Sequence, residues 1–303
     1  PELIRQARES LAGRLGMVEL GTLKMNELHQ EPLPPFYQIF SSQLSTATLD
    51  ELGTPVTKER DVVNDFLYGG YPEPVLAKSD DYFRTWMQNY FRLYIERDVR
   101  RLFPRLDSIK YRRFVSTLSE LSGTIINKAQ LGRSLDTSEV TIRDYLEIAD
   151  KTFVWRMIPS YEKSTSKSAV KMPKGILRDS GLTHFLANID SREKLIRSAN
   201  VGQNFESFII EEIIKGIQCS KATNWNYYYY RTKHGAEVDL VLEGSFGVLP
   251  IEIKFGMTTR STQIASLKRF VSDNSLPVGI VINNSTEVKT LAENIVQVPA
   301  TLI

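Results

Sequence analysis

Glu237-Val238-Asp239, followed after a short gap by Ile251-Glu252-Ile253-Lys254, is the stretch that decides how the C-terminal part of this chain folds. Apolar and charged residues alternate in both pieces, which predicts two β-strands. Side chains two positions apart share one face of a strand, so Glu252 and Lys254 point the same way. Residues 244–247 lie between the pieces and suit a turn. The two strands are therefore predicted to pair as a hairpin.

If the charged faces of the two strands coincide, Asp239, Glu252 and Lys254 converge. Mg²⁺ prefers oxygen ligands and keeps several waters, so two carboxylates suffice to hold it. The ion would activate a water and neutralise charge on a phosphate oxygen, while Lys254 would stabilise the transition state. The spacing thus predicts a Mg²⁺ or Mn²⁺ site for phosphodiester hydrolysis. The same spacing also fits an edge strand with a solvated charged face and a weak surface ion pair.

The residues upstream extend this pattern. Phe205, Ile209 and Ile213 recur at helical spacing, and Glu206 lies near the start of that predicted helix, where the dipole favours a carboxylate. The tyrosine run at 227–230 predicts a strand. The predicted order is a helix with a glutamate, a strand, a strand with Asp239 and a strand with Glu-x-Lys.

This order resembles the PD-(D/E)XK nuclease superfamily. Carried over residue by residue, the resemblance implies Asp239, Glu252 and Lys254 as catalytic residues, and Glu206, Asp239 and Glu252 as metal ligands. Val238 departs from the family pattern, because it stands where many members have proline. That position varies in the superfamily.

Further motifs resemble a large prokaryotic family of AAA-type ATPases that carry a C-terminal winged helix and a nuclease-like domain. The motifs follow one another in the family's order along nearly the whole chain: Leu11-Ala12-Gly13-Arg14, Gly69-Gly70-Tyr71-Pro72, Arg97-Asp98, and Lys174 with Asp179-Ser180-Gly181-Leu182. Each motif alone is weak, and the shared order carries the resemblance.

The sequence has no Gly-x-x-x-x-Gly-Lys-Ser/Thr phosphate loop and no Walker B strand. In the resembled family both precede the Leu-Ala-Gly-Arg segment. We therefore expect a fragment of a longer protein, or a chain that has lost its ATPase half, and ATP as a cofactor only when that half is present. Arg14 or Arg97 could act in trans on a neighbour's nucleotide within a homo-oligomer formed through the ATPase remnant. The alternative for each arginine is a surface ion pair.

Residues 109–178 predict three helices and a two-stranded wing, a winged helix-turn-helix, which the family resemblance also implies. The third helix, over 140–150, has a capping sequence at residues 136–139. In a DNA-binding protein, Thr141 and Arg143 would enter the major groove. The lysines of the wing would contact phosphates, and these are Lys163, Lys167, Lys171 and Lys174. The alternative is a protein–protein module or a spacer.

Composition sets the outer limits. A chain of 303 residues with 42% hydrophobic and 24% charged residues is typical of globular protein with about two domains. The net charge of +2 leaves no global basic field, so DNA would need a local patch such as the basic residues of 84–113. Part of this basic region lies on a helix that the sequence predicts over 80–103. The one cysteine, Cys219, excludes an intrachain disulfide. No apolar run could span a membrane, so we expect a cytoplasmic location and no membrane partner.

Together these patterns predict an α/β chain of multi-domain α+β type. The expected parts are a helical ATPase-lid remnant over 1–75, a helical and winged-helix domain over 76–195, and a PD-(D/E)XK restriction-endonuclease-like α/β sandwich over 196–303. Residues 261–303 are expected to form helix, strand, helix and strand. The predicted function is metal-dependent DNA hydrolysis or processing. The alternative is a non-catalytic DNA- or protein-binding adaptor with a nuclease-like scaffold.

Overall fold

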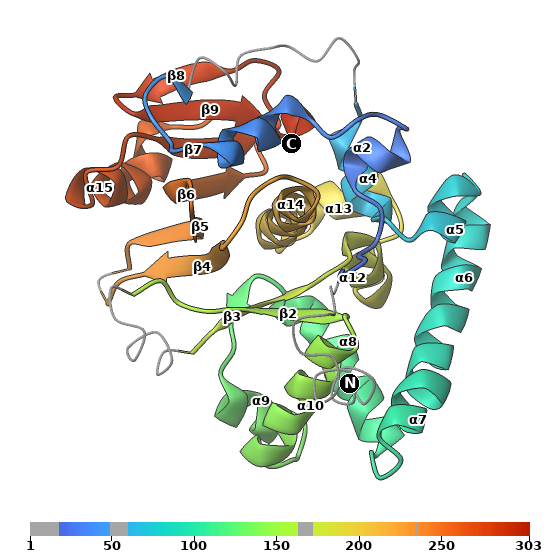
Figure 1. Ribbon diagram of the computed structural model, residues 1–303. Helices are drawn as coiled ribbons and strands as arrows, with labels where there is room; N and C mark the ends of the chain where they lie inside the picture. Colours follow the sequence, from blue (N-terminus) through green and yellow to red (C-terminus); the bar gives the residue numbers. More distant parts are fainter. Residues whose placement is uncertain (1–17, 49–59, 163–171, 234) are drawn as a thin grey trace, which may run out of the picture.

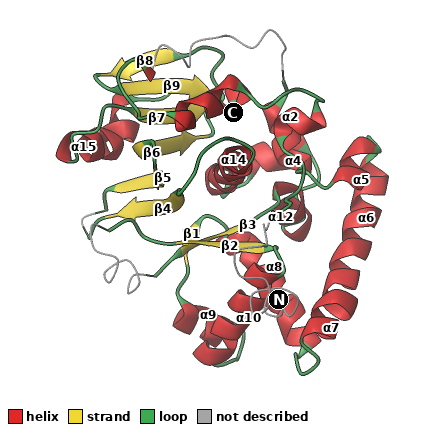
Figure 2. Ribbon diagram, in the orientation of Figure 1, coloured by secondary structure: helices red, strands yellow, loops and turns green. Residues whose placement is uncertain are grey.

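The computed structural model describes residues 18–48, 60–162, 172–233 and 235–303. These residues form a mixed α/β structure with a six-stranded mixed sheet, which confirms the expected combination of helices and strands of α+β type. Figure 2 shows the strands gathered into a large and a small sheet, with helix α14 (Val201–Gln218) between them. No helix in these ranges is both long enough and apolar enough to cross a membrane.

The strands of the two sheets are β1 (Thr124–Ile125), β2 (Trp155–Ile158), β3 (Lys174–Leu177), β4 (Asn226–Arg231), β5 (Glu237–Gly244), β6 (Gly247–Lys254), β7 (Gly279–Asn283), β8 (Lys289–Ala292) and β9 (Ile295–Pro299). The helices before α14 are α2 (Met25–Leu28), η1 (Pro35–Ser41), α4 (Val62–Tyr68), α5 (Pro72–Leu76), α6 (Asp80–Leu93), η2 (Tyr94–Val99), α7 (Arg100–Leu102), α8 (Ser108–Leu121), α9 (Lys128–Ser134), α10 (Glu139–Lys151), α12 (Ser180–Leu186) and α13 (Arg192–Arg197). After α14 come η3 (Ser261–Ile264), α15 (Ala265–Asp273) and η4 (Ala300–Leu302).

The large sheet has the strand order β4-β5-β6-β7-β9-β8. Strands β6, β7 and β9 run parallel to one another, and the remaining neighbours pair antiparallel. The predicted hairpin is confirmed, because β5 and β6 pair from Leu240 opposite Ile251 to Gly244 opposite Gly247. Successive residues of a strand point to opposite faces of the sheet, and both faces carry apolar side chains that must be covered.

Helices cover the two faces of this sheet separately. On one face, Ile209 and Ile213 of α14 join a core with Leu240 and Ile251. On the other face, Leu267 and other α15 residues join a second core with Val241 of β5 and Val281 of β7. Figure 1 shows α15 at the outer side of the sheet and α14 at the centre of the molecule. The sheet is thus enclosed between helices, as a sandwich requires.

The small sheet has the order β1-β3-β2 and is antiparallel throughout. Helices α8, α9 and α10 lie against it in the lower part of Figure 1. Trp155 of β2, Phe114 of α8 and Ile142 of α10 are fully buried in one shared core. The expected three helices and returning pair of strands are present here, with Ser138 accepting the Thr141 N–H at the start of α10.

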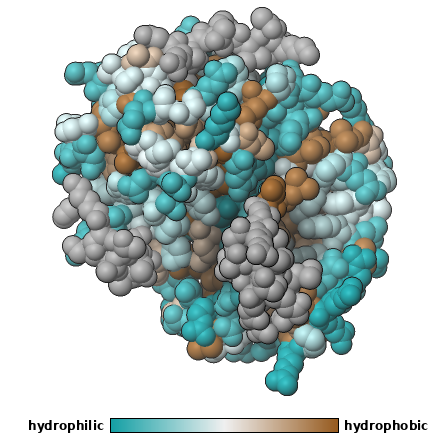
Figure 3. All heavy atoms as spheres, viewed as in Figure 1, coloured by the Kyte–Doolittle hydropathy of each residue, from teal (hydrophilic) through white to brown (hydrophobic). Residues whose placement is uncertain are grey.

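A continuous helical segment runs from α6 through η2 to α7, close to the predicted helix over 80–103. Its middle part, η2, is π-helical. Hydrophilic residues dominate its surface in Figure 3. Two of the basic residues of this region are held by ion pairs, since Arg112 Nη2 lies 2.7 Å from Glu96 Oε1 and Arg97 Nε lies 2.7 Å from Asp98 Oδ1.

The N-terminal segment packs onto the C-terminal half of the chain. The rings of Phe40 and Phe246 meet edge to face, 4.9 Å apart, and the Tyr37 hydroxyl donates to the Glu212 carbonyl at 3.0 Å. Residues from Met25 to Leu67 share one core with α14 and the large sheet. The predicted boundary at residue 75 therefore does not divide this core.

The expected second helix within residues 261–303 is wrong. Strand β8 takes its place and pairs with β9, with Ala292 opposite Ile295. Asn294 makes the tight turn between them with a φ of 58°, a left-handed conformation that asparagine tolerates. Backbone pairing with β9 thus prevails over the helix-forming residues of the segment.

Two glycines of α14 test the packing of the N-terminal segment. A Cβ atom at Gly216 would overlap the Tyr37 ring, whereas one at Gly202 would meet nothing within 4 Å. We expect Gly216→Ala to lower the free energy of unfolding by about 1–3 kcal/mol through overpacking. Gly202→Ala should leave it unchanged or raise it by up to about 1 kcal/mol, because alanine favours the helix. Urea denaturation of both variants measures the difference, and equal effects would contradict the packing described.

Candidate functional site

The β5–β6 hairpin brings three of the predicted site residues together. Its register ends at Leu240 opposite Ile251, so Asp239 and Glu252 are the next residues of the two strands beyond that pair, and Lys254 shares a face of β6 with Glu252. Lys254 Nζ lies 2.6 Å from Glu252 Oε1 and 3.5 Å from Asp239 Oδ2. The backbone N–H of Ile253 donates to Asp239 Oδ2 at 2.7 Å, which fixes that carboxylate across the strand pair. Asp239 and Glu252 are both buried.

Helix α14 supplies the fourth predicted residue, Glu206. The charges of Asp239 and Glu252 act on its carboxyl group, so Glu206 faces the same cluster. Its Oε1 lies 2.5 Å from the ammonium of Lys174, which comes from β3 in the small sheet. The structure thus gathers acidic residues from one helix and two strands, together with lysines from two different sheets.

The prediction that Lys174 contacts DNA phosphates as a lysine of the wing is wrong. Its side chain is only 2% exposed, and its Nζ lies 3.1 Å from Glu237 Oε1 as well as 2.5 Å from Glu206. It also lies over the ring of Tyr229, 5.7 Å from the centroid. Lys174 and Glu237 are therefore site residues that the sequence motifs contained but that were not assigned to this site. We name Glu206, Glu237, Asp239 and Glu252 the carboxylate cluster.

The pKa values of the cluster show how it is balanced. Burial raises the pKa of Glu206 to about 8, the Asp239 charge adds to this rise, and Lys174 opposes it. Burial and Asp239 likewise raise the pKa of Glu252 to about 8 against the effect of Lys254. Burial alone would lower the pKa of each lysine, but the surrounding carboxylates hold both above the ordinary value. The cluster therefore holds more acidic groups than its two lysines can neutralise.

The donor set suits a hard divalent cation. Glu252 Oε2 is buried and has no hydrogen-bond partner among the residues described, although a buried carboxylate oxygen requires one. Asp239 and Glu252 offer the adjacent oxygen ligands that Mg²⁺ accepts. No group of three or more His, Cys, Asp or Glu side chains in the described ranges is arranged to hold a metal ion. Glu206, the expected third ligand, is held by Lys174 instead.

The other predicted site residues lie apart from this cluster. Arg143 is exposed on α10, 3.4 Å from Asp144, and half-buried Thr141 bonds to Ser138 at the helix start. Arg97 is 65% exposed and pairs with Asp98 in η2. Four predicted residues lie outside the described part of the chain, and they are Arg14, Lys163, Lys167 and Lys171.

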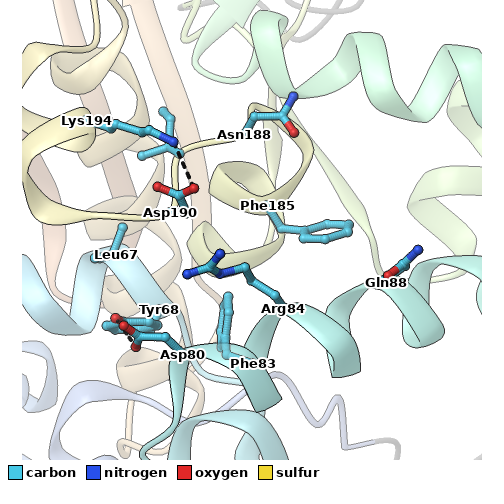
Figure 4. Close-up of a pocket in the computed structure, with 11 residues that line it drawn as sticks. Leu67, Tyr68, Asp80, Phe83, Arg84, Gln88, Phe185, Asn188, Asp190 and Lys194 are labelled. Carbon is cyan, nitrogen blue, oxygen red and sulfur yellow. Dashed lines mark hydrogen bonds and ion pairs between the residues drawn. The ribbon is translucent and has the colours of Figure 1, made fainter.

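A cavity of about 430 Å³ lies elsewhere, between α6 and the segment from α12 to α13 (Figure 4). Figure 4 shows Arg84 near its centre. The Tyr68 hydroxyl donates to Asp80 at 2.6 Å, and Lys194 pairs with Asp190 at 2.8 Å. None of its lining residues belongs to the carboxylate cluster. The carboxylate cluster is therefore marked as a candidate site by its buried charged groups, and this cavity is not part of it.

Comparison with known proteins finds two domain families. Residues 59–193 match a domain of unknown function, DUF8612, and residues 201–303 match a second domain of unknown function, DUF4143. The second is found in AAA-ATPase-associated proteins. The carboxylate cluster and α14 lie within the DUF4143 match, whereas Lys174 lies within the DUF8612 match.

The chain is also similar to two uncharacterized proteins, Rv2008c of Mycobacterium tuberculosis and Mb2031c of Mycobacterium bovis. It is 28% identical to each over 300 residues, which is 99% of this chain and 60% of the relative. The chain thus spans about three fifths of the length of the curated relatives that it matches. No solved structure matches it significantly.

The raised pKa values predict a pH dependence of stability. Between about pH 5 and pH 9 the folded state retains protons on Glu206 and Glu252 that the unfolded chain releases near its ordinary pKa. The free energy of unfolding should therefore fall by a few kcal/mol, at order of magnitude, as the pH rises across this range. Glu252→Gln should make the fall shallower, as measured by urea denaturation at several pH values.

Glu193→Gln is the matched control, because Glu193 is 70% exposed and pairs only with Arg197 among the ion pairs described. This variant should keep the wild-type slope of stability against pH. If Glu252→Gln also keeps that slope, the raised pKa of Glu252 is refuted.

Proposed function

We propose that this chain carries a metal-dependent nuclease-like domain of PD-(D/E)XK type that hydrolyses or processes DNA. The observation that carries the proposal is the placement of the Asp239 and Glu252 carboxylates within 3.5 Å of the Lys254 ammonium on the β5–β6 hairpin. Glu206 faces them from the helix that precedes the hairpin in the chain. This matches the helix–strand–strand–strand order expected of such a site.

In this proposal Asp239 and Glu252 hold Mg²⁺ or Mn²⁺, with Glu206 as the third carboxylate. The bound ion would supply Lewis-acid activation of a water and charge neutralisation at the phosphate. Lys254 contacts both carboxylates and is 27% exposed, so it can reach the substrate phosphate and orient the attacking water. The Ile253 N–H holds Asp239 in place, which keeps the ligands preorganised.

The small sheet and its helices support a DNA-binding role of winged-helix type. Exposed Arg143 stands on α10, the helix that would enter the major groove, and Thr141 lies two residues before it in the first turn of that helix. The wing lysines Lys163, Lys167 and Lys171 complete the proposal. In this proposal ATP is a cofactor, and a homo-oligomer forms, only where the ATPase half of the resembled family is present.

A second candidate is a non-catalytic DNA- or protein-binding adaptor that uses the nuclease-like fold as a scaffold. The observation that favours it is the ion pair between Glu206, an expected metal ligand, and the buried ammonium of Lys174. Salt-dependent DNA binding without cleavage would identify this function.

The nuclease proposal predicts the behaviour of two variants of β5. Asp239→Asn should abolish Mg²⁺- or Mn²⁺-dependent cleavage, with a loss of at least about 100-fold, because the charge on one of the two adjacent ligands is removed. Glu243→Gln lies on the same strand outside the carboxylate cluster and should retain wild-type cleavage. The assay follows plasmid and single-stranded DNA with each metal and with EDTA. Cleavage that is absent from the wild type across these substrates, or unaffected by Asp239→Asn, would refute the proposal.

The DNA-binding part predicts a separate effect at Arg143. Arg143→Gln should weaken DNA binding several-fold and reduce the slope of log affinity against log salt by about one, because one positive charge is lost from the DNA interface. Arg269→Gln changes an exposed arginine of α15, which lies in the large-sheet layer, and should leave the slope unchanged. Fluorescence anisotropy with a labelled duplex at several salt concentrations measures both. Equal slopes for wild type and Arg143→Gln would remove α10 from the DNA interface.

A further inference from the structure

Lys174 is a buried ammonium that comes from outside the sheet carrying the candidate site. It lies on β3, where it pairs in register with Ile158 of β2 and Ile125 of β1. Burying an unpaired ammonium costs several kcal/mol, so its position depends on the carboxylates that meet it. Glu206 and Glu237 supply these at 2.5 and 3.1 Å. The small sheet is thereby tied to the carboxylate cluster by one ion-paired side chain.

The charges of the site leave room for one divalent cation. Four carboxylates face two ammonium groups and the guanidinium of Arg231, which lies 3.9 Å from Glu237, so a fully ionised cluster carries an excess of one negative charge. The buried Glu252 Oε2 has no hydrogen-bond partner in the described part of the chain, which marks where the compensation is incomplete. A divalent cation would more than offset this excess without changing the carboxylates.

The Lys174–Glu206 pair stands in the way of that cation. Glu206 Oε1 is engaged by the lysine, so Glu206 has only Oε2 left to share an ion with Asp239 and Glu252 while the pair is closed. The lysine charge would also repel an ion at the cluster, and this repulsion is strong because the site is buried. We infer that Lys174 is a built-in competitor for the metal, and that a divalent cation binds fully only when the Lys174–Glu206 pair opens.

The small sheet would then control the site. Lys174 is the first residue of β3, and the neighbouring chain is joined to the large sheet by the Tyr229 hydroxyl, which donates to the Met172 carbonyl at 2.7 Å. The Tyr161 N–H donates to the Tyr229 carbonyl at 2.6 Å beside it. A ligand such as DNA that shifts β3 against α14 would draw Lys174 away and free Glu206. This inference rests on the metal site of the proposed function and adds its regulation.

The test is Mn²⁺ binding by the whole chain, measured by isothermal titration calorimetry and by the Mn²⁺-dependent rise in Tm. Lys174→Met keeps the apolar stem and removes the charge, so it should bind Mn²⁺ at least about tenfold more tightly than wild type. Its Tm without metal should fall and should recover with Mn²⁺, because the ion replaces the lost ammonium. Adding Asp239→Asn to Lys174→Met should abolish the gain.

Lys215→Met is the matched control, because Lys215 also pairs with a buried glutamate of α14, Glu212, at 2.5 Å but lies outside the cluster. It should leave Mn²⁺ affinity unchanged. Lys174→Gln removes the charge but keeps an N–H donor for Glu206, so it should tighten Mn²⁺ binding to a smaller extent. This second variant decides the question if Lys174→Met does not fold.

The outcomes separate this inference from the nuclease proposal. Tighter Mn²⁺ binding by Lys174→Met without any DNA cleavage supports the competitor role while the nuclease proposal fails. Mn²⁺ affinity that is unchanged or weaker in both Lys174→Met and Lys174→Gln overturns the competitor role, even if the wild type cleaves DNA. Absence of Mn²⁺ binding in every variant also overturns it.

Discussion

Helix α14 carries three glutamates into the interior, and the rest of the structure depends on the cations that meet them. Each glutamate is met by a different part of the chain: Glu206 by Lys174 of β3, Glu211 by Arg156 of β2, and Glu212 by Lys24 near the N-terminus. Removing one partner of a buried pair leaves an uncompensated charge, which costs about 3–5 kcal/mol. The helix therefore fixes the positions of segments that lie far apart in the sequence.

The three pairs differ in the number of cations that approach each glutamate. Glu211 and Glu212 are surrounded by their cations, since Arg178 also approaches Glu211 and Lys215 also approaches Glu212. Glu206 instead shares its surroundings with Asp239, which adds negative charge. Buried glutamate–cation pairs thus have two roles in this helix. At its middle they hold the fold together, and near its start the pair forms part of a site with excess negative charge. This contrast is what distinguishes the candidate site from ordinary buried ion pairs.

The sequence predicted those parts that have a local signature. Alternation over β5 and β6 and helical spacing in α14 follow from side chains that face one core, so Asp239, Glu252 and Glu206 could be placed on their elements. Lys174 could not, because it follows a lysine-rich run typical of a solvated loop, and its partner Glu206 lies 32 residues further on. Strand β8 was missed because it is an edge strand with exposed residues and no buried face to show a period. Long-range pairing decides both positions.

The packing of η1 has a consequence for how such a protein can be inherited. Phe36, Tyr37 and Phe40 complete the core beneath α14 and reach Phe246 at the hairpin tip, although they lie far ahead of the region that matches DUF4143. Recombination that moved only residues 201–303 into another gene would leave this apolar surface uncovered. Residues 201–303 therefore do not form a unit that recombination can exchange by itself. The smallest such unit also includes the N-terminal segment that closes its core.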